Sequence, residues 1–363
     1  DIMKIEKTVK YISGLAKQLQ QEISMKNNIA SSLKNEISSN SKSIMENIRN
    51  GNSEQATYYD LNTAVQVTAI GKNISVFGAD GSSIEADRDL PLEFSAINIG
   101  YININYGDKP AAEFDESLTF YPNNKDIPEV DSKLLSDINA MSALRHLLEL
   151  EFLIKKMSES KSTNIKIGFV DGNLYPNFAL SHITNINFKQ FIYKRLDEVA
   201  EKITNLSKNN TYIISYNSNP NSVHISSKIK GKYASELNDS GIFENLLKTN
   251  ERSDIFTEIS EEETRELNSV SFSFVKNSKE LSKIEFLNGS INNEVMNKIL
   301  AVIISQVEKG KGYPKILIES HEHAVISQSD RAALNTLIEK ELNLLNINYK
   351  ISQKQQSKQT RNI

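Results

Sequence analysis

The spacing of apolar residues changes along the chain, and each spacing predicts a different element. Between Ile2 and Ile23, apolar residues recur at alternating intervals of three and four, which predicts a helix of about three heptads. This helix either lies on its own domain or packs against a partner helix. From about residue 62 the pattern becomes short β-type runs bounded by Gly and Asp: AVQVTAIG, ISVFGAD and FSAINIGYININYG. Three strands in succession predict an antiparallel start to a sheet.

The later part of the chain alternates helical and strand patterns. Helices are predicted near 131–160, 187–207, 292–308 and 329–345, and strands at IKIGFVD, TYIISYN, VSFSFV and KIEFL. Strands first and helical crossovers afterwards favour an α/β domain with a mixed sheet flanked by helices. We therefore expect an N-terminal helical region and linker over 1–56, one domain over 57–350, and a disordered basic tail over 351–363.

The composition limits the possible partners and kinds of site, but it does not limit the fold class. Lys and Arg total 42 against 46 for Asp and Glu, so a nucleic-acid partner would need a local basic patch or bound cations. The absence of Cys excludes disulfides, thiolate metal sites and Cys nucleophiles. No apolar signal core opens the sequence, and the longest apolar run, ILAVII, is too short to cross a bilayer. We expect a cytoplasmic protein that makes no membrane contact.

Two apolar runs lead directly into Asp-Gly. ISVFGADGSS contains Asp80, and IKIGFVDGNL contains Asp171. Taken alone, either pair is typical of a tight hairpin turn, because both residues tolerate positive φ. Alternatively, each Asp stands at a strand end as an oxygen ligand, and the following Gly leaves room for backbone and substrate to approach.

A third carboxylate favours the second interpretation. When LRHLLELEFLIKKM is projected on a helix, Glu151 falls in the middle of the apolar arc, whereas Glu149 falls beside Arg145 on a solvated face. A buried carboxylate must be protonated, paired with a base or bound to a cation, and pairing with a buried Lys or Arg remains an alternative. Three carboxylates without Cys favour Mn²⁺ or Mg²⁺, and two such ions side by side support phosphoryl transfer.

The segment GYPKILIESHEHAVISQSD at 312–330 adds two histidines. His321 and His323 share a face if the segment is extended. Their spacing does not match the HExxH pattern of zinc sites, so either a ligand or proton shuttle, or a purely structural role, is compatible with the pattern.

A basic run follows the strand TYIISYN. Lys228, Lys230 and Lys232 alternate along SSKIKGKY, and Tyr233 can stack on a base, which together favour contact with DNA. The alternative is an edge strand that lysines protect from pairing with other chains.

The ordered set of motifs resembles one family. GADGSS, NIGYININYG, LRHLLELEFL, FVDGNL, ISYNSNPNSVHISSKIKG, SFSFVKN with KIEFL, and GYPKILIESH follow the order and approximate spacing of the NurA nuclease family over roughly residues 62–345. The resemblance implies a ribonuclease H-like fold, a ring-shaped homodimer and degradation of DNA ends with Mn²⁺ or Mg²⁺. It also implies a hexameric HerA-type ATPase as a partner, in double-strand-break end resection or antiviral defence.

The resemblance also implies roles for particular residues. Asp80 and Asp171 are similar to the two metal-binding aspartates of the family, and Glu151, chosen over Glu149 on the projection, to its helix acid. Tyr313 stands for the tyrosine of the GYP element, and His321 for a histidine that binds metal or the scissile phosphate.

One element departs from the family pattern. Ser218-Asn219-Pro220 stands where bacterial relatives carry Ser-Arg-Pro, which removes a bidentate phosphate contact.

The main hypothesis is a metal-dependent DNA nuclease in which Asp80, Glu151 and Asp171 hold the ions and His321 assists. The alternatives are a catalytically degenerate adaptor that docks on an ATPase ring, and a metal phosphatase acting on small substrates.

Overall fold

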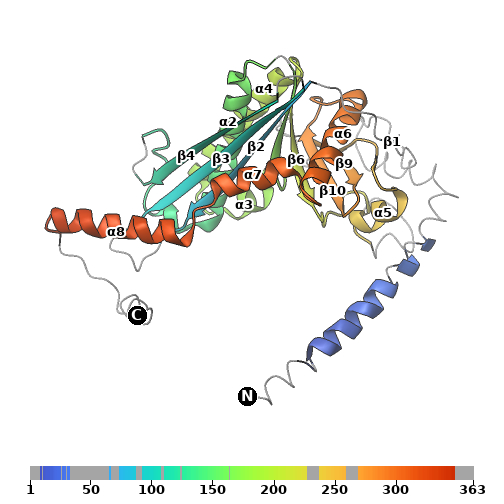
Figure 1. Cartoon of the computed structure of the whole chain (residues 1–363). Coiled ribbons are helices and arrows are strands. Elements are labelled where there is room, and N and C mark those ends of the chain that lie inside the picture. The colour runs from blue at the N-terminus through green and yellow to red at the C-terminus, as the bar shows by residue number, and fades with distance from the viewer. Residues whose placement is uncertain are drawn as a thin grey trace.

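A computed structural model of the chain gives the arrangement of its elements (Figure 1). The residues that it describes are 9, 11–25, 27–29, 31–32, 65–66, 73–86, 92–107, 110–122, 125–162, 164–226, 237–258 and 269–347. The predicted linker at 38–56, the tail at 351–363, and Lys228, Lys230, Lys232 and Tyr233 lie outside these residues.

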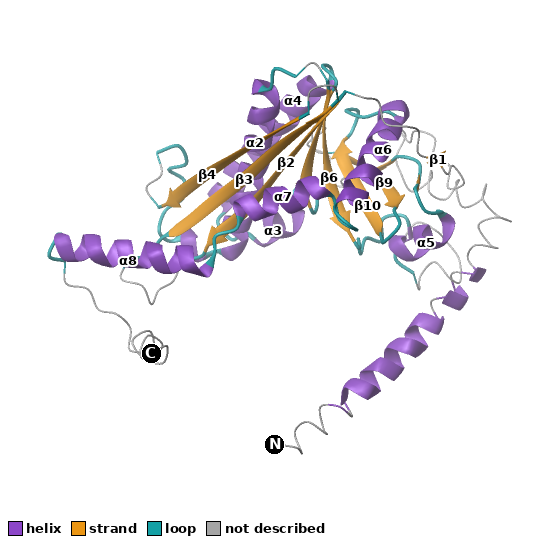
Figure 2. Cartoon of the chain, viewed as in Figure 1, coloured by secondary structure: helices purple, strands orange, loops and turns teal. Residues whose placement is uncertain are grey.

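One mixed sheet forms the centre of the molecule (Figure 2). Its strands run in the order β1-β7-β9-β10-β6-β5-β2-β3-β4, with β8 beside β9. The strands are β1 (Val65–Gln66), β2 (Ile74–Ile84), β3 (Ser95–Tyr106), β4 (Ala111–Tyr121), β5 (Ile165–Asp171), β6 (Thr211–Ser218), β7 (Glu251–Arg252), β8 (Phe256–Glu258), β9 (Val270–Lys276) and β10 (Leu281–Leu287).

Helices cover both faces of this sheet (Figure 1). They are α2 (Ile138–Glu159), α3 (Asn177–His182), α4 (Ile186–Ser207), α5 (Asp239–Leu246), α6 (Asn293–Lys309), α7 (Lys315–Ala324) and α8 (Gln328–Leu344), with a short 3-10 helix, η1 (Leu134–Ser136). Successive residues of β2 face opposite sides, as a pleated strand requires. Phe77 and Ala79 join the apolar core that includes residues of α2 and α4, while Val76 joins the core that includes residues of α6 and α7.

The pairing pattern confirms the predicted fold class. β2, β3 and β4 are antiparallel neighbours, whereas β5 and β6 continue the sheet in parallel on the other side of β2. This is the mixed, ribonuclease H-like sheet that the resemblance implied. The central strands are buried on both faces, which explains why the sequence shows them as nearly continuous apolar runs.

Two expectations for the first strands are wrong. AVQVTAIG supplies β1, but β1 pairs with β7 at the far edge of the sheet and not with β2. The third antiparallel strand is instead β4, which the apolar pattern missed because most of its residues are exposed and several are charged. Asp80-Gly81 is also not a strand end or a turn, since β2 continues to Ile84.

Two glycines let α7 lie directly on the sheet. A Cβ on Gly78 would lie 2.9 Å from the backbone oxygen of Ile316, and a Cβ on Gly100 would overlap the backbone nitrogen of Ala324. The backbone of α7 therefore crosses β2 and β3 in close contact, as the ribbon in Figure 1 also shows. This contact fixes where the side chains of α7 meet the sheet.

The N-terminal helix is present, as predicted, but its apolar seam is not covered. The described residues are helical over 11–25, and Val9, Ile12 and Leu19 are each more than half exposed. The interpretation of a helix lying along its own domain therefore does not fit these residues. Beyond that segment, Ile29 packs against an apolar cluster of the body.

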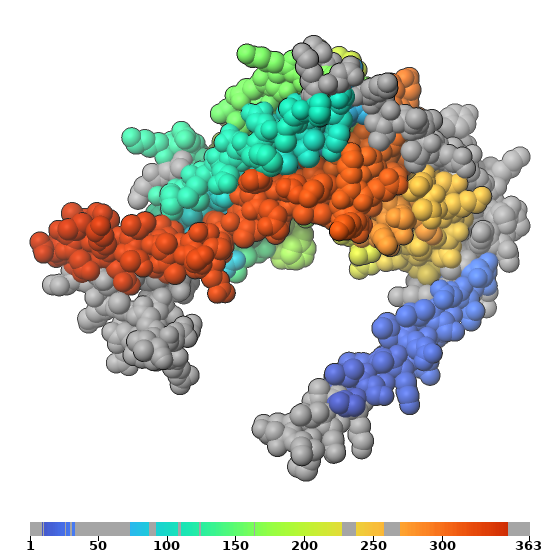
Figure 3. Space-filling model, viewed as in Figure 1, coloured from blue at the N-terminus to red at the C-terminus, as the bar shows by residue number. Residues whose placement is uncertain are grey.

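The last described helix, α8, projects from the body (Figure 3). None of its residues is buried; Leu334 and Ile338 pack against Ile84 and Phe94, and Arg331 donates a hydrogen bond to the backbone oxygen of Ser83. No helix among the described residues is long and apolar enough to cross a membrane.

Candidate active site

The parallel pairing of β2 and β5 brings Asp80 and Asp171 to neighbouring positions. The pairing of β2 with β5 ends at Gly78 and Phe169, and Asp80 and Asp171 each stand two residues further along their strands. β5 ends at Asp171, and Gly172 turns the chain away with a φ of +79°. The two aspartates thus lie where β5 stops and the edge of β2 becomes accessible.

Two side chains of the 312–330 segment contact these aspartates. His321 Nδ1 lies 2.7 Å from Asp80 Oδ2, and the Tyr313 hydroxyl donates a hydrogen bond of 2.5 Å to Asp171 Oδ1. Burial and the charge of Asp171 raise the pKa of Tyr313 above its ordinary value, so the phenol stays protonated as a donor. Four residues selected from the sequence thus form two contacting pairs, His321 with Asp80 and Tyr313 with Asp171.

The two histidines do not share a face as predicted. The segment is the helix α7 and not an extended chain, so positions two apart point in different directions. His323 turns toward β4, where its ring lies 4.6 Å from that of Phe114 and its Nδ1 lies 3.7 Å from Glu116. His323 therefore has no contact with the aspartates.

Of the acids on α2, Glu149 packs against β2. Its side chain is only 7% exposed, and its Oε1 lies 2.5 Å from where a Cβ on Gly81 would be. The carboxylate thus packs against the backbone directly after Asp80, in space that only a glycine leaves open. Arg145 Nε and His146 Nδ1 each lie 3.4 Å from it.

Glu151, which the sequence predicted as the helix acid, is paired with a basic side chain. Glu151 accepts two hydrogen bonds from Arg195 on α4, from Nε at 2.8 Å and from Nη2 at 2.6 Å. This is the alternative of a basic partner that the projection had left open. The projection failed because α2 packs against α4 as well as the sheet, so the centre of its apolar arc does not point at the strands.

Charge and burial act together on Glu149 and His146. Burial raises the pKa of Glu149, and the nearby charge of Asp80 raises it further, against the opposing effects of His146 and Arg145. Burial lowers the pKa of His146, but the hydrogen bond and charge of Glu149 outweigh it and the pKa is raised. A bound cation would reduce the electrostatic repulsion between the carboxylates of Glu149 and Asp80.

The chain that follows Asp171 is held on both sides. The backbone oxygen of Leu174 lies 3.0 Å from His146 Nε2, and the backbone N–H of Leu174 donates to Glu285 Oε2 at 2.8 Å. Lys283 Nζ lies 2.7 Å from the other oxygen of Glu285, and both side chains are buried. Sequence reasoning missed these residues, although two charges inside the apolar strand KIEFL were an available signal.

The donor atoms fit a hard divalent cation. Asp80, Glu149 and Asp171 offer only oxygens, which Mg²⁺ and Mn²⁺ prefer. The described residues contain no cluster of three or more Asp, Glu or His side chains that is already close enough to form a metal site. A bound cation would therefore have to bring the three carboxylates closer to one another.

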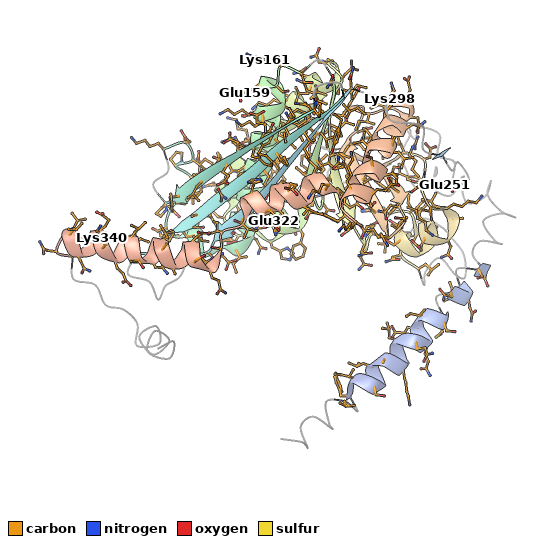
Figure 4. All side chains as sticks on the ribbon, in the orientation of Figure 1. Glu159, Lys161, Glu251, Lys298, Glu322 and Lys340 are labelled. Atoms are coloured by element: carbon orange, nitrogen blue, oxygen red, sulfur yellow. The ribbon has the colours of Figure 1, made fainter. Side chains whose placement is uncertain are left out.

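The candidate site lies along the edge formed by the ends of the central strands β5 and β2, and is open to solvent. Asp171 is exposed, and the side chain of His321 is 63% exposed. By contrast, a cavity of about 490 Å³ lies near the other end of β3, where Figure 4 labels Glu159 and Lys161 among its lining residues. An open edge suits a polymer better than a small enclosed substrate.

Comparison with known protein families shows the family to which this chain belongs. The family model described as the NurA domain matches residues 74–326, well over half of the chain and a span that includes every residue of the candidate site. The chain therefore belongs to the NurA family of nucleases. No curated protein sequence matches it significantly.

Solved NurA structures are similar to this NurA-family chain. The NurA nuclease from Sulfolobus solfataricus shares 15% identity over 85% of this chain and 95% of its own, with a TM-score of 0.50. Another NurA structure shares 10% identity over 85% and 97%, with a TM-score of 0.44. NurA with manganese shares 12% over 84% and 97%, with a TM-score of 0.36. At these identities, the likeness to the first bears on the fold alone.

Proposed function

We propose that this NurA-family nuclease hydrolyses DNA phosphodiester bonds with Mn²⁺ or Mg²⁺ ions, two of them, held by Asp80, Glu149 and Asp171. The observation that supports this most strongly is the parallel pairing of β2 with β5 up to two residues before Asp80 and Asp171, with the buried Glu149 packed against Gly81. When bound, such ions would bind the phosphate and lower the pKa of an attacking water.

The side chains around the carboxylates also have proposed roles. His321 is within hydrogen-bond distance of Asp80 and largely exposed, so it can move a proton or contact the phosphate. Tyr313 fixes the orientation of Asp171 through its hydroxyl. His146 and Glu285 hold the backbone of Leu174, which limits the freedom of the chain after Asp171.

DNA is favoured over a small phosphate by the exposure of the site. The predicted contacts of Lys228, Lys230, Lys232 and Tyr233 with DNA stay part of this proposal. They follow directly after described residue 226, on the segment beyond β6, the strand that pairs with β5.

Metal removal tests this function. Purified protein should leave linear duplex DNA intact in excess EDTA and digest it once Mn²⁺ is restored, because the three carboxylates repel one another and bind substrate poorly without cations. Hydrolysis of p-nitrophenyl phosphate in place of DNA would identify a phosphatase. Absence of digestion with any divalent cation, together with binding to a hexameric ATPase, would identify an adaptor.

We further propose that the protein is a homodimer and works with a HerA-type ATPase in the cytoplasm, in end resection or antiviral defence. β4 is an edge strand, and Phe114, Leu118 and Phe120 lie exposed on one of its faces, which supports coverage by a second copy. Light scattering should give twice the mass of one chain; the mass of a single chain would contradict the dimer.

The uncovered seam of the N-terminal helix supports docking of a partner, and loss of ATPase binding on deleting 1–32 would test it.

A further inference from the structure

Most of the described arginines are held by the protein itself. Hydrogen bonds join Arg195 to Glu151, Arg252 to Asn293 and Asn297, and Arg331 to the backbone oxygen of Ser83. The fourth described arginine, Arg145, is different. Apart from its contact with Glu149, it makes no hydrogen bond or ion pair with the residues that the structure describes.

Arg145 stands at the candidate active site. Its Cγ lies 2.8 Å from where a Cβ on Gly81 would be, so its stem packs against the backbone next to Asp80. Its Nε is buried without a hydrogen-bond partner and only 3.4 Å from Glu149 Oε1. The side chain is nevertheless 36% exposed, and since Nε and the stem are covered, the exposed part is the outer end of the guanidinium.

Other cations near this edge are already engaged. Lys283 is buried against Glu285, and Lys315 is paired with Glu319. The turn Ser218-Asn219-Pro220 after β6 contains no cation. Among these described groups, the outer guanidinium nitrogens of Arg145 are the positive charge left for a ligand.

We propose that Arg145 binds a phosphate of the DNA strand beside the scissile bond, through its outer guanidinium nitrogens. A planar guanidinium matches two phosphate oxygens, and its attachment to α2 beside Gly81 directs it to the strand held at Asp80. This inference rests on the proposed nuclease function. It adds a substrate-binding residue to a site otherwise formed by carboxylates, a histidine and a tyrosine.

The test measures DNA binding and not cleavage. Labelled linear duplex DNA is titrated with full-length protein carrying Asp171→Asn, in Mn²⁺, over a series of salt concentrations. Adding Arg145→Ala should raise Kd about 10-fold or more, as expected for loss of a charge-assisted hydrogen bond. It should also reduce the slope of log K against log salt by about one. Lys155→Ala, which removes an exposed positive charge from the same helix, should change neither quantity by as much.

A second variant separates phosphate binding from a purely structural role. Arg145→Lys keeps a positive charge near Glu149 but loses the planar pair of donors, so the proposal expects an intermediate Kd. If Arg145→Lys binds DNA as tightly as the parent, or if Arg145→Ala behaves like Lys155→Ala, the phosphate contact is refuted. Digestion by the unsubstituted protein would still support the nuclease function in that case, whereas absence of both DNA binding and digestion would overturn both proposals.

Discussion

Replacing either Asp80 or Asp171 by Asn is expected to abolish the digestion of linear DNA while leaving the fold intact. Asn has the shape of Asp but no charge, so it removes a ligand without creating a cavity. Loss of a residue that only orients a ligand typically costs about 10-fold to 100-fold. We therefore expect more than about a 100-fold loss of rate for each ligand itself.

The measurement is the initial rate of digestion of linear duplex DNA in Mn²⁺, with thermal unfolding recorded for each variant. Asp115→Asn is a matched control, because Asp115 lies on β4 of the same sheet and pairs with Lys156 away from the site. It should keep nearly full activity. Digestion by Asp80→Asn or Asp171→Asn at the parental rate would refute the catalytic assignment.

The second large effect distinguishes two glutamates on one helix. Glu149→Gln should reduce the digestion rate more than about 100-fold, because the buried carboxylate beside Asp80 is lost. Its stability should not fall, since burial already raises the pKa of Glu149 and a neutral amide is easier to bury than a charge. Glu151→Gln should do the opposite. It removes the charge and one of the two acceptor oxygens that Arg195 bonds, and should lower the free energy of unfolding by about 1 kcal/mol, with activity retained.

Urea unfolding and the digestion rate, measured on the same two proteins, check this pair. The side chains of Glu151 and Arg195 are 18% and 27% exposed, so solvent screening keeps the stability effect small. If Glu151→Gln were inactive and Glu149→Gln active, the choice of helix acid would have to be reversed.

Much of the fold could be predicted from the sequence where the pattern of buried residues along an element is regular or continuous. The strands β5 and β6 were predicted because parallel strands covered on both faces give nearly continuous apolar runs. The helix α4 was predicted because it buries one regular stripe, and α6 because its apolar residues extend over a helix-length segment that is buried on several sides. By contrast, β4 escaped the same procedure, because charged residues such as Glu113 and Glu116 are interspersed with its exposed apolar residues.

The site was predictable only in part, for a related reason. Asp80 and Asp171 were found because an acid after an apolar run is a local signal, but their adjacency depends on parallel pairing of β2 with β5, which no local pattern contains. Glu149 was missed because its space is created by Gly81 on another element. A shared face for His321 and His323 required an extended segment, whereas Gly78 and Gly100 allow a helix to lie there.

The central claim is that Asp80, Glu149 and Asp171 converge on divalent cations. The most direct measurement is anomalous diffraction from crystals of the full-length protein soaked in Mn²⁺. Our account predicts a manganese peak with carboxylate oxygens of all three residues about 2.1 Å away, the distance typical of such small cations. A peak that excludes Glu149, or no peak between Asp80 and Asp171 in crystals that bind Mn²⁺ elsewhere, would contradict it.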